Sequence, residues 1–176
     1  MRIIGGRYKG KRLQAPSGLP TRPTTDFAKE ALFNIVENQI EITETDVLDL
    51  FGGIGGISFE FASRGAKSVT SVERNNKCCR FINQTIRELD LDNLSVTQYD
   101  VFKYVAKSKK KFDLIFADPP YELKETATLP DLIFEKELLQ EDGLLIVEHA
   151  AKLDFSNHPK FVQHRKYSAV NFSFFQ

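Results

Sequence analysis

Apolar and polar residues follow a repeating order along the chain from about residue 46 onward. Short apolar runs of strand length are each followed by a stretch with helical spacing, which is typical of βαβ units and a parallel sheet. The expected strands are 46–51, 68–73, 94–99, 112–117 and 143–148. The expected helices are 57–64, 75–90, 101–106 and 125–139. The pattern therefore predicts an α/β fold with a mostly parallel sheet.

The C-terminal end departs from this order. Residues 161–167 and 169–175 each alternate apolar with polar side chains, and a tight turn separates them. This pattern predicts an antiparallel hairpin that completes the sheet.

Short strand-like pieces also occur at the N-terminus. Arg2–Ile4 and Arg12–Gln14 flank several glycines and predict a small hairpin. After it, apolar residues recur at helical spacing from about Asp26 to Glu37, and Thr24 or Thr25 is the expected N-cap of that helix.

The N-terminal segment is basic, although the whole chain has a formal net charge of +0. Asp26 is the only acid before residue 30; the cations are Arg2, Arg7, Lys9, Lys11, Arg12, Arg22 and Lys29. A cationic hairpin suits phosphate contacts, whereas a solvated surface is the other explanation of the same charges. Residues 1–24 are predicted to form a basic arm, and residues 25–176 the main domain. The residues expected to contact RNA or DNA are Arg7, Lys9, Lys11, Arg12, Arg22 and Thr24.

The composition limits the class of protein. A chain of 176 residues fits one domain, and 41% hydrophobic with 27% charged residues is ordinary for a soluble globular protein. No apolar run is long enough to span a bilayer, and the start of the chain does not resemble a secretory signal, so a cytoplasmic protein is expected. Cys78 and Cys79 are neighbours within a predicted helix, which argues against a disulfide framework or a zinc site. We expect no metal and a monomer.

Glycines and acids stand where the predicted strands end. The first strand runs into Gly52–Gly56, where the backbone can turn sharply and approach a ligand closely. The second strand ends at Glu73, whose carboxylate can accept from both hydroxyls of a ribose, and the third ends at Asp100, which can accept from an adenine amino group. This placement predicts an adenosine-containing cofactor. The expected contacts come from Asp49, Phe51, Gly53, Gly55, Glu73, Arg74, Asp100 and Val101.

Two features of the glycine loop decide between cofactors. A dinucleotide site follows the pattern Gly-x-Gly-x-x-Gly, but Ser58 stands where the third glycine is required. Asp49 would repel a pyrophosphate, whereas it suits the ammonium group of a methionine moiety. The loop therefore favours S-adenosylmethionine, whose sulfonium needs no metal.

The fourth strand ends at Asp118-Pro119-Pro120-Tyr121, at the sheet edge where ligands bind in open α/β folds. The prolines keep the loop out of the ladder and leave its carbonyls to accept bonds from a ligand. With the Asp118 carboxylate and the Tyr121 ring, the loop suits a planar group that carries an exocyclic NH2. These four residues are the predicted catalytic residues. A proline-rich turn after a strand is the simpler explanation of the same residues.

Several of these stretches resemble the motifs of a known family. Asp49 to Gly55, Glu73 and Asp100 are similar to class I methyltransferase motifs, and Asp118 to Tyr121 resembles the signature of amino-methyltransferases. The stretches that resemble the RsmD family are Arg2–Gly6, Thr21–Asp26, Lys29–Ile35, Ser63–Ala66 and Val147–His149. The likeness covers nearly the whole chain.

The resemblance implies a Rossmann-like class I methyltransferase fold with a mostly parallel seven-stranded sheet. It also implies N2-methylation of a guanine in bacterial 16S rRNA, with S-adenosylmethionine as cofactor and a small ribosomal subunit or assembly intermediate as partner. The chain departs from the family pattern at Gly52–Gly55, where the family usually reads Ala-Gly-Ser-Gly, and at Phe27, which replaces a usual arginine.

Other functions share part of this pattern. A cytosine-C5 methyltransferase needs a nucleophilic cysteine after a proline, and neither Cys78 nor Cys79 follows one. An adenine-N6 methyltransferase or a protein glutamine methyltransferase would share the logic of the Asp118 loop. From another class, a non-catalytic RNA-binding assembly protein would retain only the fold.

Overall fold

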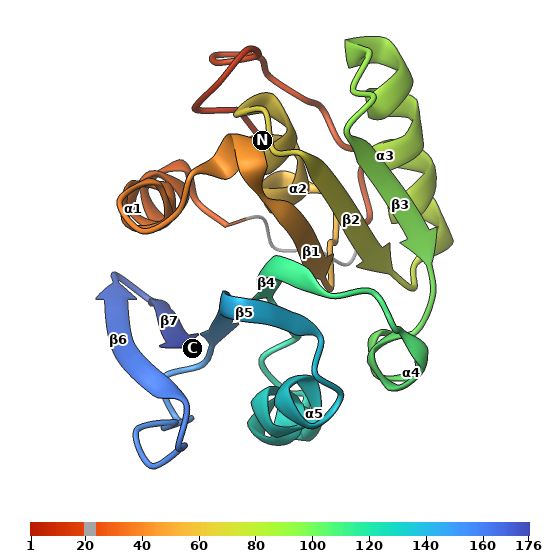
Figure 1. The fold of residues 1–176 in the computed structure, drawn as a ribbon. Helices are drawn as coiled ribbons and strands as arrows, with labels where there is room; N and C mark the ends of the chain where they lie inside the picture. Colours follow the sequence, from red (N-terminus) through yellow and green to blue (C-terminus); the bar gives the residue numbers. More distant parts are fainter. Residues whose placement is uncertain (20–23) are drawn as a thin grey trace.

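The computed structural model describes residues 1–19 and 24–176. Its centre is a seven-stranded sheet in the order β3-β2-β1-β4-β5-β7-β6, in which β1 to β5 are parallel and β7 is antiparallel to both of its neighbours (Figure 1). The strands are β1 (Asp46–Leu50), β2 (Ser68–Glu73), β3 (Leu94–Gln98), β4 (Phe112–Ala117), β5 (Leu139–His149), β6 (Phe161–Tyr167) and β7 (Val170–Phe175). The predicted mostly parallel sheet with a C-terminal antiparallel hairpin is confirmed.

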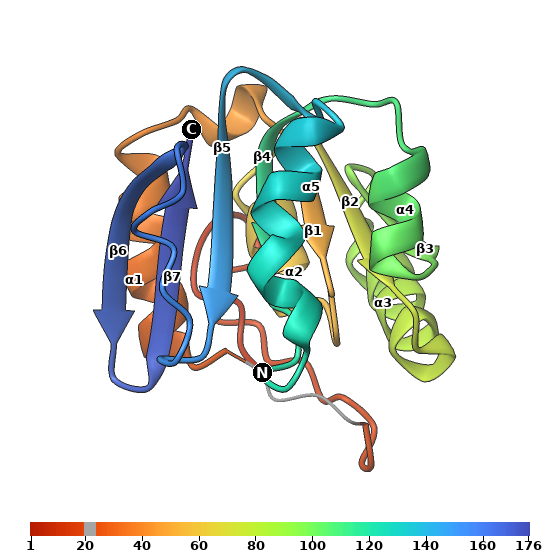
Figure 2. The same cartoon turned by 90° about the horizontal axis from the view of Figure 1, so that it is seen from below.

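Helices cover both faces of the sheet. They are α1 (Asp26–Glu37), α2 (Gly56–Ser63), α3 (Asn76–Leu89), α4 (Val101–Lys107) and α5 (Leu129–Glu135), with 3₁₀ turns η1 (Ile42–Glu44) and η2 (Lys124–Thr128). Helices α1, α2 and α3 lie on one face, and α4 and α5 lie on the other (Figures 1 and 2). Of the two expected N-caps, Thr25 begins α1, because its Oγ1 accepts from the Ala28 N–H at 3.2 Å.

One predicted helix was too long. The expected helix 125–139 starts as a 3₁₀ turn, becomes α-helical at Leu129 and ends at Glu135. Glu137 then adopts a left-handed conformation (φ 50°), which a helix cannot continue through. The chain enters β5 at Leu139, four residues before the expected strand.

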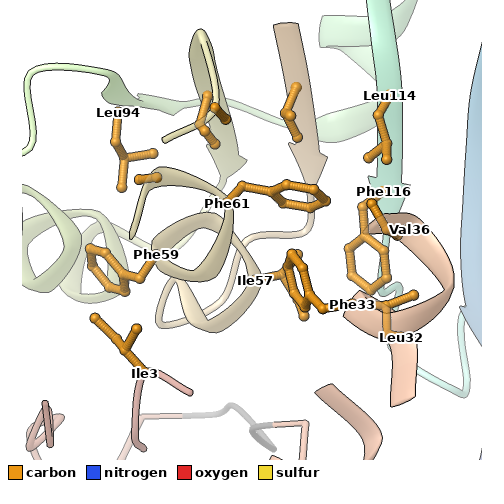
Figure 3. Packing of buried hydrophobic residues seen from close by; sticks show 14 of the residues in the cluster. Ile3, Leu32, Phe33, Val36, Ile57, Phe59, Phe61, Leu94, Leu114 and Phe116 are labelled. Carbon is orange, nitrogen blue, oxygen red and sulfur yellow. The ribbon is translucent and has the colours of Figure 1, made fainter. Parts of the chain in front are cut away.

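The core lies in two layers, one against each face of the sheet. Between the sheet and helices α1 to α3, Phe33 and Phe61 pack edge to face with ring centroids 4.7 Å apart (Figure 3). Side chains alternate along each strand, so β1 places Val47 in this layer and Leu48 in the layer against α4 and α5. Asp49 therefore points to the same face as Val47, toward helices α1 to α3.

The described part of the predicted arm, residues 1–19, is packed on the main domain. Its expected hairpin is a single antiparallel bridge between Arg2 and Arg12. Ile3 and Leu13 are buried in the core, and the Ile4 N–H donates to Glu60 on α2 at 2.8 Å.

A buried ion pair joins the arm to two helices. Lys29 of α1 is only 2% exposed, and its Nζ lies 3.0 Å from Oε1 of Glu60 while also donating to the backbone carbonyl of Arg2. Lys29, one of the cations of the basic segment, therefore stabilises the fold. No helix in the described ranges is long and apolar enough to cross a membrane.

Candidate active site

A pocket of about 770 Å³ opens at the carboxyl ends of the parallel strands. This is the edge where ligands bind in open α/β sheets, and the volume suits a nucleoside-sized ligand together with a base. The predicted site residues that line it are Thr24, Asp49, Phe51, Gly53, Glu73, Arg74, Asp100, Val101, Asp118, Pro119, Pro120 and Tyr121. The fold thus brings the predicted cofactor residues and the predicted catalytic loop to one cavity.

The glycine loop between β1 and α2 has an unusual backbone. Phe51, Gly53 and Gly55 all have positive φ angles, of 63°, 54° and 81°. Gly55 is the N-cap of α2 and is not among the pocket-lining residues; a Cβ on it would lie 2.7 Å from Cε2 of Phe59. Its glycine is therefore required by packing, and the cofactor contact predicted for it remains a prediction.

The carboxylate of Glu73 is held by the backbone at the end of β2. The Gly53 N–H donates to Oε2 at 2.9 Å, and the Asn75 N–H donates to Oε1 at 2.7 Å. Both oxygens are thereby fixed at the pocket wall, where each can accept a further bond from a diol. Asp100 also lines the pocket, but it is in addition the N-cap of α4, since its Oδ1 accepts from the Lys103 N–H at 3.0 Å.

Asp49 is a buried acid and the next-to-last residue of β1. Burial raises its pKa to about 7, although a hydrogen bond from the Ser58 hydroxyl lowers it; the negative charge of Glu73 adds to the increase. A cationic ligand group would favour the charged form of this carboxyl. Ser58, which breaks the dinucleotide pattern, therefore orients the acid.

Asp118 follows β4 directly and faces the same pocket. Burial, and then the negative charges of Glu148 and Asp49, raise the pKa of Asp118 well above its usual value. The next residue, Pro119, is buried, whereas Pro120 is exposed.

Glu148 is a site residue that the sequence reasoning did not assign. It is the next-to-last residue of β5, is only 4% exposed and lines the pocket. The Tyr121 hydroxyl donates to its Oε1 at 3.3 Å, and the Thr24 hydroxyl donates to its Oε2 at 3.4 Å. The signal was available in the sequence, because Glu148 ends a predicted strand just as Glu73 does, and Asp118 directly follows one.

The cations predicted to contact nucleic acid lie elsewhere. Arg7, Lys9, Lys11 and Arg12 are exposed and are not among the pocket-lining residues, so the structure separates them from the predicted chemistry. Arg22 lies outside the described residues. Among the described residues, no group of three or more His, Cys, Asp or Glu is arranged to hold a metal ion.

The three acids of the pocket fit S-adenosylmethionine. Asp49, Glu73 and Asp100, predicted to accept from its ammonium, ribose diol and adenine amino group, all line one cavity. Glycine at 52 lets the loop lie close to β2, where a Cβ would come within 2.1 Å of Oγ of Ser71.

A family comparison agrees with this geometry. The model of the family described as "Conserved hypothetical protein 95" matches residues 1–176. The chain belongs to this family. The likeness to the RsmD family that the motifs indicated is thereby confirmed.

Individual relatives of the RsmD family are similar over most of their length. "Putative rRNA methyltransferase YlbH" of Bacillus subtilis (strain 168) is 35% identical over 158 residues, which cover 88% of this chain and 85% of the relative. "Ribosomal RNA small subunit methyltransferase D" of Escherichia coli (strain K12) is 30% identical over 151 residues, covering 84% of this chain and 74% of the relative. The solved structure "Putative methyltransferase yhhF from Escherichia coli" has a TM-score of 0.85 and 27% identity, covering 100% of this chain and 97% of that one.

One departure from the RsmD pattern lies beside the pocket. Phe27 is 65% exposed and meets Tyr167 edge to face, with centroids 6.3 Å apart. Tyr167 itself lines the pocket, so Phe27 places an aromatic ring against a pocket-lining residue.

Proposed function

We propose that the protein transfers a methyl group from S-adenosylmethionine to N2 of a guanine in bacterial small-subunit ribosomal RNA. The observation that carries this proposal is the shared pocket, in which the acids at the ends of β1, β2 and β3 meet the loop Asp118-Pro119-Pro120-Tyr121. The names of both relatives support ribosomal RNA as the substrate, and the name of the Escherichia coli relative supports RNA of the small subunit.

The acids bind and orient the cofactor. Asp49 pairs with its ammonium group, Glu73 accepts from the ribose hydroxyls, and Asp100 accepts from the adenine amine. When bound, S-adenosylmethionine supplies a methyl group on a sulfonium, which a neutral nitrogen lone pair can attack. The remaining task of the protein is to make such a lone pair available.

The Asp118 loop performs that task. The exocyclic nitrogen of guanine is a weak nucleophile because its lone pair is delocalised into the ring. When the Asp118 carboxylate and the Pro119 carbonyl accept its two N–H bonds, the lone pair turns toward the methyl group. Tyr121 stacks on the base. Holding the two reacting atoms in line lowers the activation free energy by several kcal/mol, about 7 in favourable cases.

The raised pKa of Asp118 has two consequences. Burial, and then the negative charges of Glu148 and Asp49, favour the neutral form of its carboxyl. A cationic cofactor and two N–H donors favour the carboxylate, so the acceptor form is expected when both substrates are bound. A carboxylate with a raised pKa is also a stronger base than an ordinary aspartate, and Asp118 is the proposed acceptor of the released proton.

The base must leave its helix to reach the pocket, as bases modified by enzymes generally do. Arg7, Lys9, Lys11 and Arg12 are the exposed cations proposed to hold the phosphates of the flanking RNA. The proposed partner is a small ribosomal subunit or an assembly intermediate, and the proposed enzyme is a monomer.

The direct test is transfer of labelled methyl from S-adenosylmethionine to three substrates that lack prior modification. These are 30S particles, protein-free 16S rRNA and DNA. The proposal expects N2-methylguanosine in the particle or the rRNA and no product on DNA. A methyl group on adenine would support the assigned site but identify a different target base. Cofactor binding without transfer would support the non-catalytic RNA-binding alternative.

A further inference from the structure

Two acids stand side by side at the end of adjacent strands. The last registered pair of β4 and β5 is Ala117 with Val147, so the next residues, Asp118 and Glu148, follow at the same level. Neighbouring strands lie about 4.8 Å apart. Because side chains alternate, both acids continue the side of the sheet that carries Phe116 and Ile146, toward helices α1 to α3.

The geometry holds the Glu148 carboxylate at the pocket wall. Its side chain is almost fully buried, yet it lines the same cavity as Asp118. The hydroxyls of Tyr121 and Thr24 donate to it over 3.3 and 3.4 Å. Hydroxyl bonds in proteins are usually 2.5–3.0 Å long, so both of these contacts are long. The charge of Glu148 also reaches Asp118, since it is one cause of the raised pKa there.

We propose that Glu148 accepts the N1–H of the target guanine while Asp118 and Pro119 hold the N2 amine. The inference rests on the function proposed above and adds the group that selects the base. N1–H and the 2-amino group of guanine are adjacent donors on one edge, and two adjacent carboxylates match that edge.

The same pair rejects adenine. Adenine presents an amino group beside a bare N1, whose lone pair would face the Glu148 carboxylate. When Glu148 is a carboxylate, two acceptors then face each other with no proton between them. A site built to bond a substrate N–H discriminates strongly against an analogue that lacks it, because its own polar group is left unpaired.

Glu148 has a simpler possible role, which is only to position Tyr121 and Thr24. That role predicts the same loss of activity on every base when Glu148 is changed. Base selection predicts a change in the ratio between two bases, so the ratio distinguishes the two roles.

The experiment uses two RNA substrates that differ at the target nucleotide, guanosine or 2-aminopurine. 2-Aminopurine keeps the 2-amino group but has a bare N1. The quantity measured is kcat/KM for each RNA, with wild-type protein, Glu148→Gln and Glu141→Gln. A glutamine at 148 can donate to the bare N1, whereas Glu141 lies at the exposed start of the same strand and serves as the matched control.

The proposal expects wild type and Glu141→Gln to prefer guanosine by about 100-fold or more, and Glu148→Gln to reduce that preference by about tenfold or more. If Glu148→Gln turns over neither RNA, the ratio of its affinities for the two RNAs decides in the same way. An unchanged ratio, or wild-type protein that methylates 2-aminopurine as well as guanosine, overturns the proposal. If wild type methylates neither RNA but transfers to another base, the proposed function itself has failed.

Discussion

The pocket and the N-terminal arm both contain many charged residues, but they hold them in opposite environments. In the pocket, Asp49 is buried and Asp118 is partly buried, and burial is the main cause of the raised pKa of each. In the arm, Lys9 and Lys11 are exposed, and the contacts that fix the segment are made by its backbone and by Ile3 and Leu13.

This difference separates chemistry from recognition. Buried acids depend on exact placement and protonation, so a single substitution there should change the reaction. Exposed cations act mainly through their number, because each phosphate contact releases about one counterion. The two regions should therefore respond to different variables, pH for the pocket and salt for the arm.

The largest effect is expected at the pocket. Asp118→Ala removes one acceptor of the amine, and methyl transfer in a single turnover should fall by about 10²- to 10⁴-fold. The affinity for S-adenosylmethionine should change little, because Asp49, Glu73 and Asp100 remain. Retained transfer would show that Asp118 does not act on the amine.

The next effect tests the attachment of the arm. Lys29→Met leaves Glu60 buried, with Arg64 as its remaining cation at 3.7 Å, and should lower the free energy of unfolding by about 3 kcal/mol. Urea denaturation measures this change. Lys67→Met is the control, because it breaks an exposed pair with Asp46 and should cost below about 1 kcal/mol. Equal losses in both variants would mean that the buried pair does not anchor the arm.

The pocket should also make stability depend on pH. The pKa of Asp49 rises from 3.8 to about 7 on folding, so the folded chain binds its proton more tightly than the unfolded chain. The resulting contribution to stability is complete below about pH 4 and is lost as pH rises through 7, up to about 4 kcal/mol. Without cofactor, Asp49→Asn should gain stability over wild type between pH 5 and pH 8 in urea denaturation. If the free energies of unfolding of the two proteins change with pH in the same way, the raised pKa of Asp49 is contradicted.

The smallest effect should come from the arm. Lys9→Ala with Lys11→Ala should flatten the dependence of log affinity for RNA on log salt by roughly 1.5, since each phosphate contact contributes about 0.7–0.9. Lys109→Ala with Lys111→Ala removes the same charge from the turn before β4 and should leave the slope nearly unchanged. Equal slopes in the two double variants would show that the arm does not contact phosphates.

Much of the fold was predictable from local pattern. The parallel strands and the final hairpin follow from apolar runs and alternation, because each buries a definite face. The end of α5 was not predictable, because Glu137, just after the helix, adopts a left-handed conformation that its residue type does not favour.

The site was predictable only in part. Asp49, Glu73 and Asp118 could be found because each lies at or next to the end of a strand, and the carboxyl ends of parallel strands meet at one edge. The contacts of Glu148 with Tyr121 and Thr24 could not be predicted, because they join residues 27 and 124 positions apart in the sequence. Likewise, the sequence does not show that Lys29 is buried against Glu60 while Lys9 stays in water.

The central claim is that the Asp118 loop holds the exocyclic nitrogen of guanine beside the cofactor. The measurement that tests it most directly is a crystal structure of the protein with S-adenosylhomocysteine and a short RNA containing the target guanine. The account predicts that N2 lies about 2.7–3.2 Å from both the Asp118 carboxylate and the Pro119 carbonyl oxygen. A guanine that enters the pocket by another edge, or that binds outside the loop from Asp118 to Tyr121, would contradict the account.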